Sequence, residues 1–246
     1  MPPKGQLIVA LDVDTFEKAR ELIGMLSPAV DIFKVGSQLF TVCGPSIVPF
    51  IINQHKKVFL DLKYHDIPNT VAQSISGAIA LSANRASKDI QHLLKENPGL
   101  LMCTVHALGG KTMLQAAVQA SQEAAEKHNV KRPLIIGVTV LTSEEHNNNV
   151  QDTVLKMAHL AKEAGCDGVV TSVNEARAVR QQLGEDFVIV TPGIRPEGSS
   201  PGDQKRIATP RQAIANGSNF LVVGRPIIES DNPLNAAKNI LQEINS

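Results

Sequence analysis

The sequence has no tryptophan, one tyrosine and seven phenylalanines, so aromatic residues make up only 3% of its 246 positions. Proteins that bind single-stranded nucleic acid commonly stack bases on aromatic side chains, and this sequence offers few of them. It also has no excess of charge, because 24 Lys and Arg residues balance 24 Asp and Glu residues. The composition therefore gives no support to nucleic acid or an anionic membrane as a main partner.

Long apolar runs and paired cysteines are also missing. No apolar run approaches the roughly 20 residues that a membrane-spanning helix needs. The first residues, MPPKGQL, lack the apolar segment of a secretory signal peptide. Cys43, Cys103 and Cys166 include no CxxC pair and are expected to be reduced, mostly buried thiols. These absences predict a soluble, cytoplasmic protein.

What the sequence does contain is a series of short segments rich in valine, isoleucine and leucine. They barely alternate with polar residues, which is typical of strands buried on both faces. The expected strands cover residues 7–11, 31–36, 57–62, 100–105, 133–140, 167–172, 186–193 and 219–224. Helical patterns lie between them, so the sequence predicts a (β/α)8 TIM barrel that forms one domain over residues 1–246. A doubly wound open sheet is the structural alternative.

Three of the expected helices begin with capping signals, in which a residue that favours the N-cap is followed three positions later by Glu or Gln. The pairs are Asp14 with Glu17, Ser172 with Glu175, and Thr209 with Gln212. Thr209 is also followed by a proline, which favours the first helical position.

Residues 82–99 form a connection that is longer than a minimal barrel unit requires. Within it, SKDIQHLLKE (87–96) is expected to form an extra surface helix capped by Ser87. In a barrel, a connection from a helix to the next strand lies on the face opposite the active site. Surface decoration or an oligomer contact is therefore the favoured role for this segment.

Charged residues stand where three neighbouring strands are expected to end. The segment LDLKYHDIPNT places Asp61, Lys63 and Asp66 at and just beyond the end of the third strand. Side chains two positions apart share one face of a strand, so Asp61 and Lys63 should lie about 7 Å apart on the same side. Lys34 holds the corresponding place on the second strand and Asp12 on the first. Because barrel active sites lie at the carboxyl ends of the strands, four charges should converge there; a purely structural ion-pair network is the alternative.

Two loops near the end of the chain have the features of a phosphate site. Residues 191–210 follow the seventh expected strand, predict a mobile loop and carry Arg195 and Gln204. Gly224 and Arg225 follow the eighth strand. Loops after these two strands bind phosphate in many barrels, where glycine exposes a backbone N–H and arginine bonds two phosphate oxygens. An ordinary solvated loop with surface arginines is the alternative.

Other catalytic motifs are missing from the sequence. It has no P-loop, HExxH or GxSxG motif, and its histidines show no recognised metal-ligand spacing, so no metal site is predicted. His106, after the fourth expected strand, is expected to make a structural hydrogen bond.

Read in order, the segments ALDV, KVG, LDLKYHDIPNT, VHALGG, VTVLTS, TPGIRP, GDQKR and VVGRPI resemble the orotidine 5′-phosphate decarboxylase family in its shorter, bacterial form. The resemblance covers essentially the whole chain. The DxKxxD pattern alone marks only a wider group of phosphate-binding barrels, so the specificity comes from the complete set. The longer 82–99 segment is the one departure, and it leaves the motifs intact.

The resemblance implies decarboxylation of orotidine 5′-phosphate to UMP and CO2 in de novo pyrimidine biosynthesis. It implies a cofactor-independent homodimer with shared active sites. Lys34, Asp61 and Lys63 of one subunit would join Asp66 of the other in a Lys-Asp-Lys-Asp array, and Lys63 would protonate C6 of the pyrimidine.

The resemblance also implies a set of substrate contacts. Asp12 and Lys34 would contact the ribose, and Ile67 and Thr70 would reach the ring and ribose from the other subunit. The remaining implied positions are Thr142 for the substrate, and Arg195, Gln204, Gly224 and Arg225 for the phosphate.

Two other functions stay open. A sister class that decarboxylates sugar-acid phosphates, such as 3-keto-L-gulonate 6-phosphate, shares the fold and the DxKxxD pattern. That class uses Mg²⁺ and has an acidic residue on the second strand, where this sequence has Lys34. A barrel that senses a nucleotide phosphate without reacting is the non-enzymatic alternative, and the presence of both Asp61 and Lys63 argues against it.

Overall fold

The computed structural model of the chain describes residues 5–140, 150–196 and 208–245. In these ranges eight parallel strands form a closed barrel, in which β1 pairs with both β2 and β8. The strands are β1 (Gln6–Ala10), β2 (Ile32–Gly36), β3 (Lys57–Tyr64), β4 (Leu100–His106), β5 (Leu134–Val138), β6 (Gly168–Val170), β7 (Val188–Thr191) and β8 (Phe220–Val223). The predicted TIM barrel is confirmed, and the open-sheet alternative is wrong because β1 and β8 close the ring.

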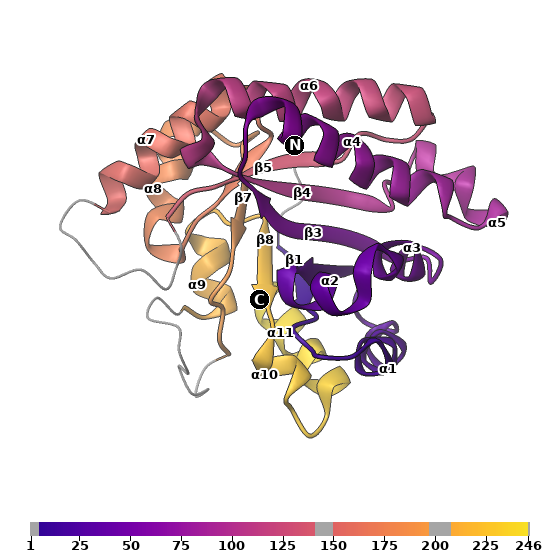
Figure 1. The fold of residues 1–246 in the computed structure, drawn as a ribbon. Coiled ribbons are helices and arrows are strands. Elements are labelled where there is room, and N and C mark those ends of the chain that lie inside the picture. Colours follow the sequence, from indigo (N-terminus) through magenta and orange to yellow (C-terminus); the bar gives the residue numbers. More distant parts are fainter. Residues whose placement is uncertain (1–4, 141–149, 197–207, 246) are drawn as a thin grey trace.

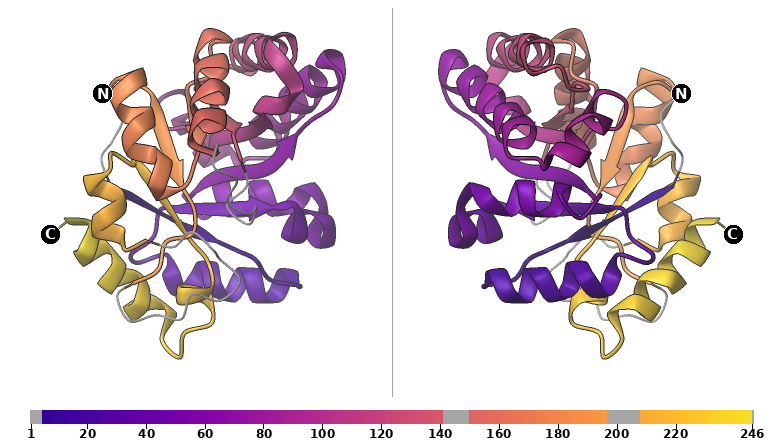
Figure 2. Two further views of the ribbon diagram at one scale, coloured as in Figure 1. Left: turned by 90° about the vertical axis from the view of Figure 1, so that its left-hand side faces the viewer. Right: turned by 90° about the vertical axis from the view of Figure 1, so that its right-hand side faces the viewer.

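Helices surround the strands in all three views of the ribbon (Figures 1 and 2). They are α1 (Phe16–Leu26), α2 (Ser37–Cys43), α3 (Ile47–Ile52), α4 (Pro68–Asn84), α5 (Lys88–Gln91), α6 (Gly110–His128), α7 (Val150–Glu163), α8 (Val173–Leu183), α9 (Pro210–Ala215), α10 (Arg225–Ile228) and α11 (Pro233–Asn245). Three short 3₁₀ turns are η1 (Gly44–Ser46), η2 (Leu93–Lys95) and η3 (Ala107–Gly109). Every strand is thus followed by at least one helix before the next strand begins.

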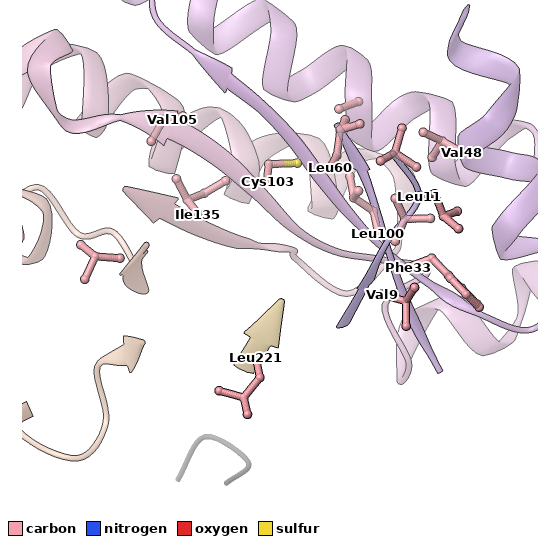
Figure 3. Packing of buried hydrophobic residues seen from close by; sticks show 14 of the residues in the cluster. Val9, Leu11, Phe33, Val48, Leu60, Leu100, Cys103, Val105, Ile135 and Leu221 are labelled. Carbon is pink, nitrogen blue, oxygen red and sulfur yellow. The ribbon is translucent and has the colours of Figure 1, made fainter. Parts of the chain in front are cut away.

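Alternation along the strands divides the core into two layers. Ile8, Ile32 and Phe59 belong to a cluster whose buried members all come from strands, which places it inside the barrel. Val9 and Phe33, the next residues on their strands, belong to the larger cluster that includes the helices. Figure 3 shows both of them in this outer layer. Since side chains alternate with a period of two, each strand position is assigned to the barrel interior or to the helix layer.

The structure corrects one of the three predicted helix starts. The N-cap of α1 is Thr15, whose hydroxyl accepts a hydrogen bond from the Lys18 N–H at 3.2 Å, and not Asp14. Asp14 instead forms an exposed ion pair with Lys18. Thr15 has the extended backbone that an N-cap needs, with φ −141° and ψ 156°. The predicted Asp14 capping box is therefore wrong by one residue.

The other two helix starts are as predicted at the cap itself. Ser172 is the N-cap of α8, and its hydroxyl both accepts a hydrogen bond from the Asn174 N–H at 3.3 Å and bonds the Glu175 carboxylate. Thr209 and Gln212 form a complete capping box at α9, with each side chain bonded to the other residue's backbone N–H. Local sequence thus placed both caps correctly, at a serine or threonine directly before the first helical residue.

The long connection before β4 contains α5 and η2 in place of one continuous helix over 87–96. Ser87 occupies the N-cap position of α5 without a side-chain cap hydrogen bond. A cavity of about 260 Å³ lies between this segment and the start of β3, with Lys57 and Gly99 in its wall. Lys57 begins β3 and Gly99 directly precedes β4, so the cavity is at the amino-terminal end of the strands.

The three cysteines are separate thiols, as expected, with Cys103 and Cys166 buried and Cys43 partly buried. Burial raises the pKa of Cys103 and of Cys166 to about 12, so both thiols are neutral near pH 7. Among the residues that the structure describes, none of the helices has the length and apolar character that a membrane span requires.

Candidate active site

Four charged side chains meet at the carboxyl ends of β1, β2 and β3. Asp12 lies two residues beyond β1, Lys34 lies within β2, and Asp61 and Lys63 lie in the last half of β3. All four occupy strand positions in phase with the barrel interior, because Ala10, Ile32 and Phe59 belong to the inner cluster. We call Asp12, Lys34, Asp61 and Lys63 the four-charge cluster.

Opposite charges alternate along the four-charge cluster. Lys34 Nζ lies 3.1 Å from Asp12 Oδ1 and 3.7 Å from Asp61 Oδ2, and Lys63 Nζ lies 2.9 Å from the same Asp61 oxygen. The side chains of Lys34 and Asp61 are only 11% exposed, whereas that of Lys63 is 39% exposed. Every buried charge therefore has a partner of opposite sign, which offsets the cost of removing it from water. The predicted convergence of these four residues is confirmed.

Thr104, a buried residue on β4 that the sequence did not predict as part of the site, contacts the four-charge cluster. Its hydroxyl lies 3.0 Å from Asp61 Oδ1 and accepts a hydrogen bond from the Lys63 backbone N–H at 2.9 Å. Within the run LLMCTV a threonine looks like an ordinary β-branched strand residue. The available signal was its phase: Thr104 is two residues from Met102, which faces the barrel interior.

Lys63 also has an unusual backbone. Its φ is 50°, in the left-handed region that residues other than glycine seldom adopt. The pairing of β3 with β4 shifts here, since Leu60 pairs with Cys103 and Tyr64 with Val105. A strained, irregular backbone at a charged strand end is common at functional sites.

Asp66, Ile67 and Thr70 lie beyond β3 and are exposed. Asp66 Oδ1 accepts a hydrogen bond from the backbone N–H of Ile67 at 2.7 Å. The Ile67 side chain is 66% exposed, which is unusual for a large apolar residue. Among the described residues, Asp66 forms no ion pair with the four-charge cluster.

The predicted phosphate residues are only partly described. Arg195 is buried after β7, and its backbone N–H donates to the Ala208 carbonyl at 3.0 Å. Gly224 directly follows β8, and a Cβ built on it would lie 3.5 Å from Asp12 Oδ2. The strand end that carries Gly224 and Arg225 is therefore adjacent to the four-charge cluster. Thr142 and Gln204 lie outside the described residues.

His106 makes the structural hydrogen bond that was expected, since its Nδ1 accepts from the Leu108 N–H at 3.3 Å. Its ring stacks on His65, with centroids 5.3 Å apart. This contact holds the segments after β3 and β4 side by side. Tyr64, next to Lys63, is partly buried, and this burial raises its pKa, which keeps the phenol neutral.

The groups that the described site offers for chemistry are lysine ammoniums and carboxylates held in fixed positions. No group of three or more His, Cys, Asp and Glu side chains in the described ranges has an arrangement that could hold a metal ion. A cation held against a carboxylate at the mouth of a water-restricted site can stabilise developing negative charge and deliver a proton.

Comparison with known proteins gives a consistent result. A family model described as "Orotidine 5′-phosphate decarboxylase / HUMPS family" matches residues 5–240. The orotidine 5′-phosphate decarboxylase of Moorella thermoacetica is 44% identical over 253 aligned positions, covering 99% of this chain and 94% of that protein. The same-named protein of Legionella pneumophila subsp. pneumophila is 43% identical, covering 99% of this chain and 100% of its own. A crystal structure of orotidine 5′-phosphate decarboxylase from Lactobacillus acidophilus superposes with a TM-score of 0.80 at 34% identity, with full coverage of both chains.

Proposed function

The chain belongs to the orotidine 5′-phosphate decarboxylase / HUMPS family, and from this premise we propose that it converts orotidine 5′-phosphate to UMP and CO2 in de novo pyrimidine biosynthesis. The observation that carries the proposal is the four-charge cluster. It places two lysines and two carboxylates in alternating order at the mouth of the barrel.

Lys63 is the proposed proton donor. Loss of CO2 leaves a carbanion at C6 of the pyrimidine, where no cofactor delocalises the charge. The Lys63 side chain is the more exposed of the two lysines, at 39% against 11% for Lys34, so it is the one that a bound substrate can reach. A cation fixed beside C6 stabilises the carbanion and then protonates it.

Asp61 has the proposed place beside the departing carboxylate. Two like charges about 4 Å apart repel by about 4 kcal/mol at an effective dielectric near 20. Relief of that repulsion would give about three powers of ten in rate. Such a gain is too small for a reaction this difficult, so stabilisation of the carbanion by Lys63 carries the larger weight.

The phosphate group supplies binding energy away from the reacting carbon. Arg195, Gln204, Gly224 and Arg225 are the proposed phosphate residues, and Thr142 is a further proposed substrate contact. Arg195 and Gly224 lie beyond the carboxyl ends of the neighbouring strands β7 and β8, which supports this assignment. Binding energy from a non-reacting group can organise charges at the reacting centre.

The proposed active unit is a homodimer. Asp66 of each subunit would complete the Lys-Asp-Lys-Asp array of the other, with Ile67 and Thr70 contacting its substrate. The exposure of Ile67, 66%, supports this assignment, because an apolar side chain at the rim of the mouth is a candidate for burial against a partner.

Lys34 argues against the magnesium-dependent sister reaction. Its ammonium lies 3.1 Å from Asp12 Oδ1 and 3.7 Å from Asp61 Oδ2, between the two carboxylates that could otherwise share a divalent cation. We therefore expect turnover to be unaffected by EDTA.

A spectrophotometric assay with orotidine 5′-phosphate in the presence of EDTA tests the proposed reaction. Lys63→Ala should lower kcat by at least about 10⁴-fold, because proton delivery contributes about 10²–10⁴ and electrostatic stabilisation about 10²–10³. The control is Lys18→Ala, which removes an exposed lysine from an ion pair on α1 and should leave kcat unchanged. Near-normal turnover by folded Lys63→Ala would refute the mechanism, and UMP binding without turnover by the wild type would indicate a sensor.

A further inference from the structure

The geometry points to Thr104 as a positioning residue for this reaction: its hydroxyl holds the Asp61 carboxylate and the Lys63 backbone in their working arrangement. This inference rests on the proposed function, because it assigns a role in the same active site. Thr104 is fully buried on β4, in phase with the barrel interior.

The hydrogen bonds of Thr104 have only one consistent direction. The Lys63 backbone N–H can only donate, so Thr104 Oγ1 accepts at that contact, over 2.9 Å. The hydroxyl proton is then directed to Asp61 Oδ1, 3.0 Å away, because an ionised carboxylate can only accept. One hydroxyl therefore links a backbone donor of β3 to a carboxylate of the same strand.

This contact replaces part of the ladder between β3 and β4. Leu60 pairs with Cys103 and Tyr64 with Val105, so the two pairs are four positions apart on β3 but only two positions apart on β4. The Lys63 N–H lies in this irregular stretch and bonds the Thr104 side chain. The left-handed backbone of Lys63, with φ 50°, is thus held from across the strand pair.

The same contact fixes the rotation of the Asp61 carboxylate. Oδ1 is bonded to Thr104, which leaves Oδ2 directed at both Lys63 Nζ (2.9 Å) and Lys34 Nζ (3.7 Å). Without the hydroxyl, the carboxylate could turn and the Lys63 backbone could relax. Fixed dipoles and charges are effective in catalysis because they need no reorganisation during the reaction, so we expect the loss to appear in kcat.

Two pairs of variants isolate the hydroxyl. The wild type and Thr104→Val differ by the hydroxyl at nearly constant volume, and Thr104→Ser and Thr104→Ala differ by the hydroxyl after loss of the methyl group. In each pair, removal of the hydroxyl should lower kcat by between about 10-fold and 100-fold, the scale of a displacement of up to about 1 Å. KM should change by less than about threefold, because the proposed phosphate contacts are elsewhere.

The matched control is Ser121→Ala. Ser121 is equally buried, but it lies on α6 in the helix layer, where its hydroxyl donates to the Val118 carbonyl at 2.7 Å and accepts from Arg132 Nη1 at 3.1 Å. Its loss should change stability without changing kcat. If Thr104→Val does not fold, the comparison of Thr104→Ser with Thr104→Ala still tests the role of the hydroxyl.

The outcomes separate the two proposals. A wild-type protein that does not turn over orotidine 5′-phosphate would overturn the proposed function. An active wild type with unchanged kcat in folded Thr104→Val, or with Thr104→Ser and Thr104→Ala equally impaired, would overturn the positioning role alone. A fall confined to the two variants without a hydroxyl would support it.

Discussion

Gly36 ends β2 and leaves the space that the Lys34 ammonium occupies. A Cβ built on Gly36 would lie 2.8 Å from Lys34 Nζ and 3.7 Å from Asp12 Oδ1. Its φ of −91° is open to any residue, so an alanine would strain no backbone. The added carbon would displace the ammonium end of the flexible Lys34 side chain and would disturb little else. A glycine is therefore needed at position 36 to leave room for the Lys34 ammonium, and not for the backbone conformation.

Gly36→Ala should consequently lower kcat by about 10-fold to 100-fold, because the lysine ammonium is displaced, while the free energy of unfolding changes by less than about 1 kcal/mol. Steady-state kinetics and urea unfolding measure the two effects separately. Gly24→Ala, on the exposed face of α1 with no atom within 4 Å of the added carbon, is the control for the kinetics. Wild-type kcat in Gly36→Ala would show that the Lys34 position tolerates displacement.

Single residues also show what the sequence could and could not predict about the site. Asp12, Lys34, Asp61 and Lys63 were predictable because the period of two and the strand ends place them together. Thr104 was not, since its contact with Lys63 spans 41 positions and depends on the register between two strands. The left-handed backbone of Lys63 arises from the same irregular pairing and has no local signal in the sequence.

At the scale of elements, replacing a glycine by alanine should have opposite effects on stability in a helix and in a barrel strand. Gly168 lies in β6, where an added Cβ would be 2.2 Å from the Val188 carbonyl oxygen and 2.6 Å from the Val188 Cβ. A backbone atom at that distance cannot move without shifting β7. Gly24 in α1 faces open space, so there the added carbon meets nothing.

Gly168→Ala should therefore lower the free energy of unfolding by about 1–3 kcal/mol, as overpacking does. Gly24→Ala should raise it by about 0.5–1 kcal/mol, because alanine favours the helix. For a chain of this size each kcal/mol corresponds to about 2–4 °C in Tm, so thermal unfolding followed by circular dichroism resolves both signs. A destabilised Gly24→Ala, or a neutral Gly168→Ala, would contradict the packing described for these elements.

The boundaries of elements were less predictable than their order. All eight strands lie where apolar segments predicted them, but β6 is only Gly168–Val170 within the expected 167–172. At α1, Asp14 and Thr15 are both favourable caps, and only the backbone geometry selects Thr15. The 87–96 segment carries a helical pattern, yet it divides into α5 and η2, because a helix of about ten residues has little stability of its own.

At the scale of the whole molecule, the rim of the mouth is the surface that we propose meets a second subunit. Ile67 and Leu108 are 66% and 63% exposed, beyond β3 and β4 respectively. The stacked rings of His65 and His106 hold these two segments together. Asp66 lies on this rim, where its carboxylate bonds its neighbour's N–H and not the four-charge cluster. A second subunit docked here would bury the apolar residues and receive Asp66.

Mixing two inactive variants tests whether the sites are shared. In a dimer of Lys63→Ala with Asp66→Ala, one site would contain both substitutions and the other neither. Equal amounts exchanged at random give about half heterodimers, each with one intact site, so activity should recover to about a quarter of the wild-type value.

The matched control for that mixture combines Lys63→Ala with Asp61→Ala. These two residues contact each other within one chain, 2.9 Å apart, so each site of that heterodimer keeps one defect. We expect no recovery in this mixture once native mass spectrometry has verified subunit exchange. Recovery in the first mixture alone requires that Asp66 act across the interface. If Lys63 and Asp66 of one chain formed the same site, each site of that heterodimer would keep one defect. Equal behaviour of the two mixtures would instead assign all of these residues to a site within one subunit, and dimerisation would then have no catalytic role.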